Sequence, residues 1–480
     1  MRFLVLPLSM MFLLSCGIQD SEHSQRIDLS KSGVQEQINL NEGWHYLEQN
    51  VAYEDLGGIP EDDWQSIDLP HTWNHQDATD DLPGYRRSSS WYRKYITLPK
   101  YDGAIHLYFE GVNIVTRILV NGQKVGGHVG GYLGFEVDIS DYAQPGRPNE
   151  ILVWVDNSVN PDIIPEQNLD FIIYGGVTRD VWLKFYPEVS LRTVHISTLE
   201  VSEAKASTKV QVQVNSKLER DTMVKVVASL VDPAGSKRSS SSIKATVKPG
   251  VSLLPIKLAD LENPLLWSPQ SPHLYTIHVS LRLGEISDEI SQRFGYRWFE
   301  FEESGHLQLN GEPISIIGAR RNEAGARADG YHRRDIELIK KNGANGILLS
   351  NHPHDPAIYR ACDELGLLIW DDFPWFGEGV GSAYWEENVE GLLKQQISQK
   401  YNHPSILVWS FGDEYIEQSQ VTGEGKNNSR ERLISRLLAI THDYDPYRSL
   451  NVSKYGDRLK ISQVYRHDLG QDLQSASTQR

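Results

Sequence analysis

Cysteine and positive charge are both scarce in this sequence, and each scarcity excludes a class of protein. Only Cys16 and Cys362 occur among the 480 residues, so a scaffold held together by several disulfides is excluded. Acidic residues outnumber basic ones by 64 to 47, and the formal net charge of −17 would repel nucleic acids and anionic lipid surfaces. Glycine-rich phosphate loops and dinucleotide-binding fingerprints are also missing. We therefore expect no cofactor and no nucleic-acid partner.

The composition is that of a globular protein with room for several domains. Hydrophobic residues make up 39% and charged residues 23% of the chain, and the length fits two to four domains. The 12 Trp and 22 Tyr provide flat rings of the kind that stack on the apolar faces of sugars. Most Trp residues of a large protein belong to its core, so this aromatic content alone is a weak indication of sugar binding.

The first 16 residues have the pattern of a bacterial export signal. Arg2 is followed by an apolar run that ends at Leu14, Ser15 and Cys16, and the run is too short to span a bilayer as a helix. It resembles a lipoprotein signal peptide, which predicts a lipid anchor on Cys16 and a place in the bacterial cell envelope, at the periplasmic or outer-membrane face. The alternative is an ordinary secretory signal in which Cys16 has no role. Residues 17–37 are polar and aperiodic, as expected of a tether.

Residues 38–187 predict a β-sandwich of the jelly-roll type. Short alternating runs are separated by turn residues, with no helical pattern between them. Asn121-Gly122 follows one such run and predicts a two-residue hairpin turn. Residues 188–293 continue with alternating runs, such as 209–214 and 224–228, and their length fits a smaller immunoglobulin-like sandwich.

After Phe294 the pattern changes to strands that alternate with helices. Continuous apolar strands that alternate with amphipathic helices indicate parallel strands buried on both faces, as in a (β/α) barrel. We expect this TIM-barrel domain to cover residues 294–480 with about six strands, which would leave the barrel incomplete. Its expected strands are 314–317, 347–349, 367–370, 406–409, 448–452 and 462–465. Its expected helices are 334–343, 357–365 and 389–401.

Polar residues cluster directly after these strands. In a (β/α) barrel the carboxyl ends of the strands form the face that carries the active site. We therefore expect the polar residues after successive strands to lie together at one end of the barrel. They are residues 320–323, 350–352, 371–372 and 413–414, and among them we expect Arg321, Glu323, Asn351, Asp372, Asp413 and Glu414 to form the site.

Several segments, in this order along the chain, resemble motifs of glycoside hydrolase family 2. Residues 168–181 resemble the loop and strand that close the first sandwich in that family, and residues 264–275 resemble the end of its second sandwich. Residues 294–313 are similar to its entry into the barrel, and residues 402–414 to the segment that carries its acid/base. The resemblance covers nearly everything after the tether and is to the β-galactosidase/β-glucuronidase type.

The resemblance implies a retaining β-glycosidase in which Glu414 is the general acid/base. Such an enzyme needs one carboxyl group that protonates the departing oxygen and then deprotonates water, in a partly dry site that raises its pKa. Glu414 follows an apolar strand, which fits a deep position at the barrel mouth. The substrate would be a β-linked glycoside or oligosaccharide, with galactoside and glucuronide first and mannoside as a third choice. The expected substrate-binding residues are Asp413, Arg321, Glu323, Asn351, Asp372, Asp170 and Trp375.

Three of these interpretations stay open at the level of sequence. Asp170 matches a sugar-contacting acid of the family's galactosidases, and it fits a turn-capping aspartate equally well. Trp375 either lines a sugar subsite or anchors its loop. The segment 352–355 contains two histidines and Asp355, yet helix capping by Asp355 explains it better than a metal. We expect no metal ligand, with a structural or activating cation left open.

The sequence also departs from the family's pattern. Asp413 stands where the family usually has an asparagine, and Leu348, Asn351 and Asn322 replace its arginine and two histidines. The nucleophile of the family is a glutamate on a later strand, and the glutamates after Glu414 have loop or helical contexts instead. A retaining double displacement needs both carboxylates, so we expect inefficient hydrolysis. The competing hypothesis is a surface-anchored carbohydrate-binding protein that has lost catalysis.

Overall fold

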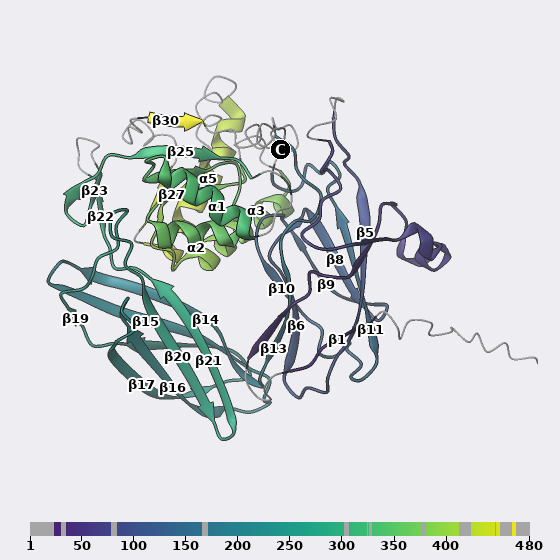
Figure 1. Cartoon of the computed structure of the whole chain (residues 1–480), viewed down its shortest axis with the longest axis horizontal. Helices are drawn as coiled ribbons and strands as arrows, with labels where there is room; N and C mark the ends of the chain where they lie inside the picture. The colour runs from purple at the N-terminus through teal and green to yellow at the C-terminus, as the bar shows by residue number, and fades with distance from the viewer. Residues whose placement is uncertain are drawn as a thin grey trace, which may run out of the picture.

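The computed structural model describes residues 24–29, 35–77, 84–165, 171–301, 307–323, 325, 329–375, 381–411, 424–446, 448–451 and 463–466. These residues form two β-sandwiches and one domain of parallel strands and helices (Figure 1). The predicted fold class is confirmed. None of the described helices is both long and apolar enough to cross a membrane.

The first sandwich packs a seven-stranded sheet against a four-stranded sheet. The large sheet has the order β4-β3-β5-β11-β8-β9, with β1 beside β5, and the small sheet has the order β10-β6-β13-β2. Its described part contains two 3-10 helices and no α-helix. The elements are β1 (Gln25–Arg26), β2 (Glu36–Asn39), β3 (Trp44–Leu47), η1 (Tyr53–Gly58), η2 (Glu61–Asp63), β4 (Gln65–Ile67), β5 (Ser89–Thr97), β6 (Ala104–Phe109), β7 (Val112–Asn113), β8 (Val115–Val120), β9 (Gln123–Val129), β10 (Phe135–Asp138), β11 (Pro148–Asp156), β12 (Gly176–Val177) and β13 (Val181–Tyr186).

The predicted hairpin turn joins β8 to β9. Val120 pairs with Gln123, so Asn121 and Gly122 are the two loop residues. Their φ angles are 49° and 79°. A two-residue turn that matches the twist of the strands needs positive φ at both positions, and asparagine and glycine adopt it most readily. The hairpin prediction is confirmed for this reason.

The second sandwich is built of longer strands in two four-stranded sheets. One sheet has the order β14-β15-β18, with β19 beside β15, and the other has the order β17-β16-β20-β21. Strand β16 alternates buried with more exposed residues, which places Val224, Val226, Ala228 and Leu230 in the core between the sheets. The strands are β14 (Val189–Val201), β15 (Lys205–Ser216), β16 (Thr222–Val231), β17 (Lys237–Val247), β18 (Gly250–Lys257), β19 (Leu261–Glu262), β20 (Tyr275–Leu283) and β21 (Ile286–Phe294).

The third domain is a parallel sheet with helices, entered through a small three-stranded sheet. The parallel sheet has the order β29-β28-β27-β26-β25-β30. Strand β29, the fifth along the chain, pairs with β28, the fourth. Strand β30, the sixth, pairs instead with β25, the first, as the last strand of a closed barrel does. The elements are β22 (Phe299–Phe301), β23 (Leu307–Leu309), β24 (Glu312–Pro313), β25 (Ile317–Arg321), α1 (Asp329–Lys341), β26 (Gly346–Leu349), α2 (Pro356–Leu365), β27 (Leu368–Phe373), α3 (Ala383–Lys400), β28 (Ile406–Phe411), α5 (Glu424–Tyr444), β29 (Ser449–Asn451) and β30 (Gln463–Arg466).

Helix α2 begins and ends where its local sequence dictates. The side chain of Asp355 accepts a hydrogen bond from the backbone N–H of Ala357 at 2.8 Å, and Pro356 occupies the first helical position. Gly366 ends the helix in the left-handed conformation with φ 73°. The prediction that Asp355 caps a helix is confirmed.

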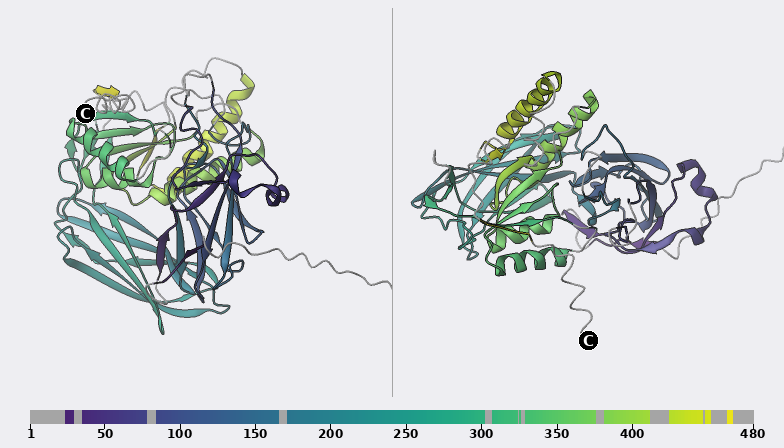
Figure 2. Two further views of the ribbon diagram at one scale, coloured as in Figure 1. Left: turned by 45° about the vertical axis from the view of Figure 1, so that its right-hand side comes forward. Right: turned by 90° about the horizontal axis from the view of Figure 1, so that it is seen from above.

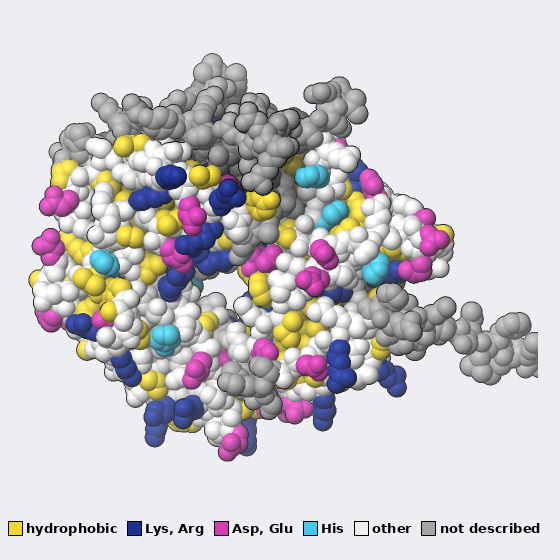
Figure 3. Space-filling view, in the orientation of Figure 1, with side chains coloured by type: hydrophobic (Ala, Val, Ile, Leu, Met, Phe, Trp, Pro, Cys, Tyr) yellow, Lys and Arg dark blue, Asp and Glu magenta, His cyan; other side chains and the backbone are white. Residues whose placement is uncertain are grey.

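The three domains contact one another. The barrel domain lies beside the first sandwich and above the second in the view of Figure 1, and the two further views agree (Figure 2). The indole N–H of the buried Trp267 donates to the backbone oxygen of Asp363 at 2.9 Å, which joins the second sandwich to α2. On the face shown in Figure 3, acidic and basic side chains are interspersed rather than gathered into a patch of one sign.

Candidate active site

Alternation along the parallel strands decides which polar residues face the interior of the barrel domain. Arg320, Leu348 and Trp370 are register partners on three neighbouring strands, and Leu348 and Trp370 pack in an apolar cluster apart from the helices. The next partners along, Arg321 and Leu349, lie on the opposite face, where Leu349 packs with residues of α1, α2 and α3. Arg320 therefore faces the interior, and Arg321 faces the helix layer.

A hydrogen-bonded row of polar side chains lies at the carboxyl ends of β25, β26 and β27. Nε of Arg320 donates to Oγ of Ser350 at 2.8 Å, and this hydroxyl donates to Oδ1 of Asn351 at 3.4 Å. The backbone N–H of Asn351 donates to Oδ2 of Asp372 at 3.0 Å. We call Arg320, Ser350, Asn351 and Asp372 the polar row. It combines a cation, a hydroxyl, an amide and a carboxylate, which are the groups that bind sugar hydroxyls.

The backbone at Asn351 is held in an uncommon conformation. Its φ of 78° lies in the left-handed region, which residues other than glycine seldom adopt and which asparagine tolerates best. The carboxylate of Asp372 accepts its N–H and so fixes the turn after β26. Such conformations cluster at functional sites, where neighbouring contacts maintain them.

The two adjacent aspartates of β27 have different surroundings. Asp371 accepts hydrogen bonds from the hydroxyl of Tyr359 on α2 and from Nε2 of Gln396 on α3, the latter at 2.8 Å. Asp371 therefore joins the helices to the sheet. Asp372 points to the other face and belongs to the polar row, so the structure brings Asn351 and Asp372 together as expected.

Arg321 lies away from the polar row, contrary to expectation. Its side chain is buried and donates to Nδ1 of His332 at 2.9 Å and to Oδ2 of Asp335 at 3.0 Å, both on α1. It also lies 3.3 Å from Nδ1 of His354. These contacts occupy the guanidinium in tying β25 to the helix layer. The arginine that faces the interior is its neighbour, Arg320.

Glu323 lies in a buried cluster that joins the barrel domain to the first sandwich. Arg179, two residues before β13, donates from Nη2 to Oε2 of Glu323 at 2.9 Å and to the backbone oxygen of Pro353 at 2.7 Å. Its Nη1 donates to the backbone oxygen of Tyr132 at 2.7 Å. The backbone N–H of Asp355 donates to Oε1 of Glu323 at 3.2 Å. We call Arg179, Glu323 and Asp355 the interdomain cluster.

The interdomain cluster fixes the segment that follows the polar row. The ring of Tyr132 stacks on the ring of His352, with 3.8 Å between centroids and 8° between planes. Gly111 leaves space for Arg179, since a Cβ there would lie 2.8 Å from Cδ of the arginine. Asn351 is thus held from one side by Asp372 and from the other through His352 and Pro353 by the first sandwich.

Charge and burial act against each other in the pKa values of the interdomain cluster. Burial favours the neutral form of Glu323, but the charge of Arg179, with three histidines nearby, outweighs it and lowers the pKa of this carboxyl. Burial raises the pKa of Asp355 despite the same arginine. Burial also lowers the pKa of His352 to about 4, so this ring is neutral at neutral pH.

Three of these residues could supply ligands to a metal ion. Glu323, His332 and Asp355 each offer one atom, and the three atoms lie within 4.8 Å of one another. The guanidinium of Arg179 already lies 2.9 Å from Glu323 and 4.0 Å from Asp355. A metal ion at this position would be repelled by that charge. The arrangement fits a buried ion cluster better than a metal centre.

Trp375 belongs to the core rather than to a subsite. Its side chain is fully buried and meets Trp385 of α3 edge to face, with 6.2 Å between centroids. A ring without an exposed face offers no platform for a sugar, so the loop-anchoring interpretation of Trp375 holds. Four of the predicted site residues lie outside the described residues, namely Glu414, Asp413, Asp170 and Cys16.

Three residues of this region were not predicted as site residues. Arg320 and Ser350 were visible beside the expected residues, and the period of two along a strand separates Arg320 from Arg321. Arg179 was part of a recognised motif, but nothing local shows that its partner is Glu323, which is 144 residues away.

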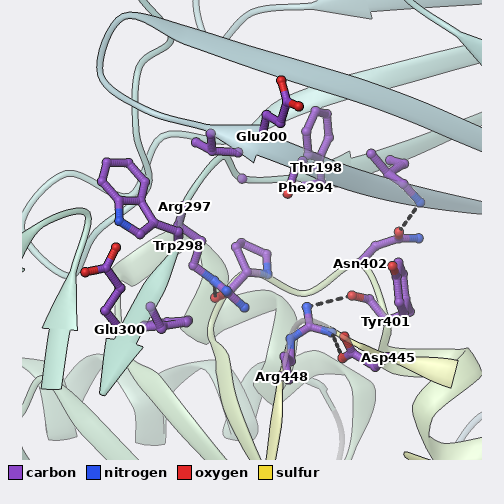
Figure 4. A pocket seen from close by; sticks show the side chains of 15 residues that line it. Thr198, Glu200, Phe294, Arg297, Trp298, Glu300, Tyr401, Asn402, Asp445 and Arg448 are labelled. Carbon is purple, nitrogen blue, oxygen red and sulfur yellow. Dashed lines mark hydrogen bonds and ion pairs between the residues drawn. The ribbon is translucent and has the colours of Figure 1, made fainter. Parts of the chain in front are cut away.

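A cavity lies at the opposite, amino-terminal end of the strands, against the second sandwich (Figure 4). Its volume is about 370 Å³. Arg297 donates to the backbone oxygens of Pro404 and Ile406, and Arg448 donates to the backbone oxygen of Tyr401. The guanidinium groups are thus engaged in joining the loops before β28 and β29. In (β/α) barrels this end of the strands contributes to stability rather than to catalysis. We therefore interpret the cavity as part of the contact between the barrel domain and the second sandwich.

Three family-level sequence profiles match the chain in order. They are described as the sugar binding domain of glycosyl hydrolases family 2 at residues 63–187, glycosyl hydrolases family 2 at residues 189–297, and the TIM barrel domain of the same family at residues 300–464. Together they cover the two sandwiches and the parallel sheet with its helices.

Individual proteins agree with the profiles. A Formosa agariphila protein that carries a provisional β-glucuronidase name is 41% identical over 435 residues, which cover 89% of this chain and 52% of that protein. A β-galactosidase of Thermoanaerobacter pseudethanolicus is 31% identical over 388 residues, 78% of this chain and 51% of that protein. The solved structure of Bacteroides uniformis β-glucuronidase 2, covalently bound to cyclophellitol-6-carboxylate aziridine, has a TM-score of 0.81 at 29% identity and covers 88% of this chain and 54% of that one. The chain thus spans about half the length of these relatives.

Proposed function

The chain belongs to glycosyl hydrolase family 2, and we propose that the protein hydrolyses β-linked glycosides at the carboxyl ends of strands β25 to β28. The polar row is the observation that carries the proposal. It places Arg320, Ser350, Asn351 and Asp372 at the end of the sheet where a (β/α) barrel holds its active site. The β-glucuronidases and β-galactosidases among the relatives support the substrate class.

The proposed mechanism is a retaining double displacement with Glu414 as acid/base. Asp372 is the register partner of Ser410 on β28, four residues before Glu414. An ionised carboxylate at this position would disfavour ionisation of a neighbouring carboxyl and help to keep it protonated for the first step. In the first step Glu414 protonates the departing oxygen while a second carboxylate, about 5–5.5 Å away, attacks the anomeric carbon and forms a covalent glycosyl-enzyme. In the second step Glu414 deprotonates the water that hydrolyses this intermediate and releases the second carboxylate. Among the predicted site carboxylates that the structure describes, Asp372 faces the interior, whereas Glu323 is engaged by Arg179.

The polar row favours an acidic sugar. The guanidinium of Arg320 supplies a positive charge at the interior face, and a guanidinium pairs well with the carboxylate of a glucuronide. A galactoside lacks this carboxylate and would rely on hydroxyl contacts with Asn351 and Asp372. We therefore propose a β-glucuronide as the preferred substrate over a β-galactoside.

Turnover of nitrophenyl β-glucuronide and β-galactoside by the purified protein tests these proposals. Glu414→Gln should abolish turnover of both, because the acid/base is removed. Arg320→Gln should lower kcat/KM for the glucuronide by about 10-fold or more and leave the galactoside within a few fold, since one buried charge-assisted hydrogen bond contributes about 1.5–3 kcal/mol. Binding of either sugar without turnover would overturn the hydrolase and favour the carbohydrate-binding protein.

We further propose that the protein is exported and lipid-anchored through Cys16. The apolar run that ends at Leu14, Ser15 and Cys16 supports this proposal. Growth with a fatty-acid analogue should label the wild type and not Cys16→Ser, with Cys362→Ser as the matched control that keeps the label. Equal labelling of the wild type and Cys16→Ser would refute the anchor.

A further inference from the structure

A groove of about 750 Å³ runs between the edge of the first sandwich and helix α3. Its volume lies within the range of about 300–1,000 Å³ that is common for ligand sites. Strands β8 and β9 form one wall, and β9 is an edge strand of its sheet. The other wall is formed by Tyr384, Glu387, Asn388, Gly391, Leu392 and Gln395 of α3.

Hydrogen bonds hold the two walls at a fixed separation. Nε2 of His128 lies 3.1 Å from Oε1 of Gln395, and Nδ2 of Asn388 donates to the backbone oxygen of Val129 at 3.1 Å. Nε2 of Gln395 donates to the backbone oxygen of Gly134 at 2.7 Å. The groove therefore exists before any ligand binds, which lowers the entropic cost of binding.

Gly391 keeps the groove open. It lies in the interior of an 18-residue helix, where glycine is a poor helix former compared with alanine. A Cβ built there would meet nothing within 4 Å, so packing does not require glycine. Residues three and four positions apart share a helix face, and Gly391 therefore lies on the same face as Asn388 and Gln395. A larger side chain at this position would enter the groove.

The groove also has polar atoms without partners. Oγ1 of Thr116 and Oδ1 of Asn388, both on lining residues, are buried and make no hydrogen bond within the part of the chain that the structure describes. Both atoms are closed to solvent, so they can gain a ligand partner only if the side chains around them shift when the ligand binds.

We propose that this groove binds an oligosaccharide chain, as a second saccharide site apart from the polar row. Tyr384 is 55% exposed, and an exposed aromatic ring can stack on the apolar face of a sugar. Arg117, Lys124 and Glu387 also line the groove. The two cations can donate hydrogen bonds to sugar hydroxyls, and the carboxylate can accept them. A peptide strand added to β9 is disfavoured, because α3 already takes the backbone oxygen of Val129.

The test is a calorimetric titration with β-1,4-linked galactotetraose of the full chain carrying Glu414→Gln, so that the β-linked probe is bound but not hydrolysed, and the variants below are compared in this background. Gly391→Leu should weaken binding by about tenfold or more, since it fills the groove, while the melting temperature stays equal or rises because leucine is the better helix former. Gly330→Leu, on α1, is the matched control, because a Cβ there also meets nothing within 4 Å. It should leave binding unchanged. Tyr384→Ala should weaken binding several fold by removing the stacking ring.

The outcome separates this site from the proposed active site. Asp372→Asn should retain binding of the tetrasaccharide, because Asp372 lies in the polar row and not in the groove. Loss of binding in Asp372→Asn together with normal binding in Gly391→Leu would place the sugar in the polar row and overturn the proposal. Absence of binding by the chain that carries only Glu414→Gln would overturn it as well, whatever the result of the nitrophenyl glycoside assay.

Discussion

Replacement of Arg179 by methionine removes the central cation of the interdomain cluster while keeping most of the volume of the side chain. Arg179 is 3% exposed and donates to three acceptors, which are Oε2 of Glu323 and the backbone oxygens of Pro353 and Tyr132, at 2.7–2.9 Å. Arg179→Met removes the charge that lowers the pKa of Glu323 and leaves this buried carboxyl without its cation. The first sandwich also loses its hydrogen bonds to the segment after Asn351.

The expected cost follows from these contacts. Each buried acceptor left unpaired costs about 1–3 kcal/mol, and removal of one partner from a buried ion pair costs about 3–5 kcal/mol. The two figures describe overlapping effects, so we expect Arg179→Met to lower the free energy of unfolding by about 3–5 kcal/mol. Arg179→Met combined with Glu323→Gln should cost less than the sum of the single changes, because the double variant buries neither charge of the pair.

The assay is urea denaturation followed by tryptophan fluorescence, together with hydrogen exchange of the amides of residues 350–355. Exchange is included because a chain of several domains need not unfold in one step. These amides report directly on the segment that the interdomain cluster holds. Arg26→Met is the control, since the side chain of Arg26 is 81% exposed and should change stability by less than about 0.5 kcal/mol. A loss below about 1 kcal/mol with unchanged exchange, or strict additivity with Glu323→Gln, would refute the reasoning.

Three further predictions follow from buried side chains of the barrel domain. Burial lowers the pKa of His352 to about 4, so the free energy of unfolding should fall as the pH drops from 6.5 toward 4. His352→Phe should flatten this part of the pH profile measured by urea denaturation, and an unchanged slope would contradict the prediction. Burial lowers the pKa of Lys400 to about 7, so stability should rise from about pH 7 toward 10.5, and a rise that persists in Lys400→Met would contradict the assignment. Trp375→Ala should lower the free energy of unfolding by about 3–5 kcal/mol, and a loss below about 1 kcal/mol would point away from the core.

Much of the fold could be predicted from local sequence. The alternation of residues 209–214 and 224–228 predicts strands of a sandwich, and β15 and β16 contain them. The predicted helix at 357–365 became α2, whose ends are set by Asp355, Pro356 and Gly366. These features depend on side-chain period, capping and allowed φ angles, and each is decided by a few residues that are neighbours in the sequence.

The candidate site could be predicted only in part. The polar residues after successive strands indicated one end of the sheet, and Asn351 and Asp372 do meet there. The period of two along β25 could have assigned Arg320 to the interior and Arg321 to the helices. From sequence alone this period did not show which arginine faces the interior, because both faces of a parallel strand are buried and either arginine would need polar partners there.

The sequence by itself determined most of the strands, helices and turns, and at which end of the sheet the polar residues gather. It was wrong on the first barrel strand, which is β25 at Ile317–Arg321 and not 314–317, and on the tether, since β1 at Gln25–Arg26 pairs with β5; helix α5 was not predicted. Only the tertiary structure decided that Arg179 meets Glu323 across 144 residues, that β30 pairs with β25, and that Trp375 is enclosed by the core. The physical reason is that a backbone conformation is chosen by nearby residues, whereas the partner of a buried charge or ring is chosen by desolvation and packing between segments that are distant in the chain.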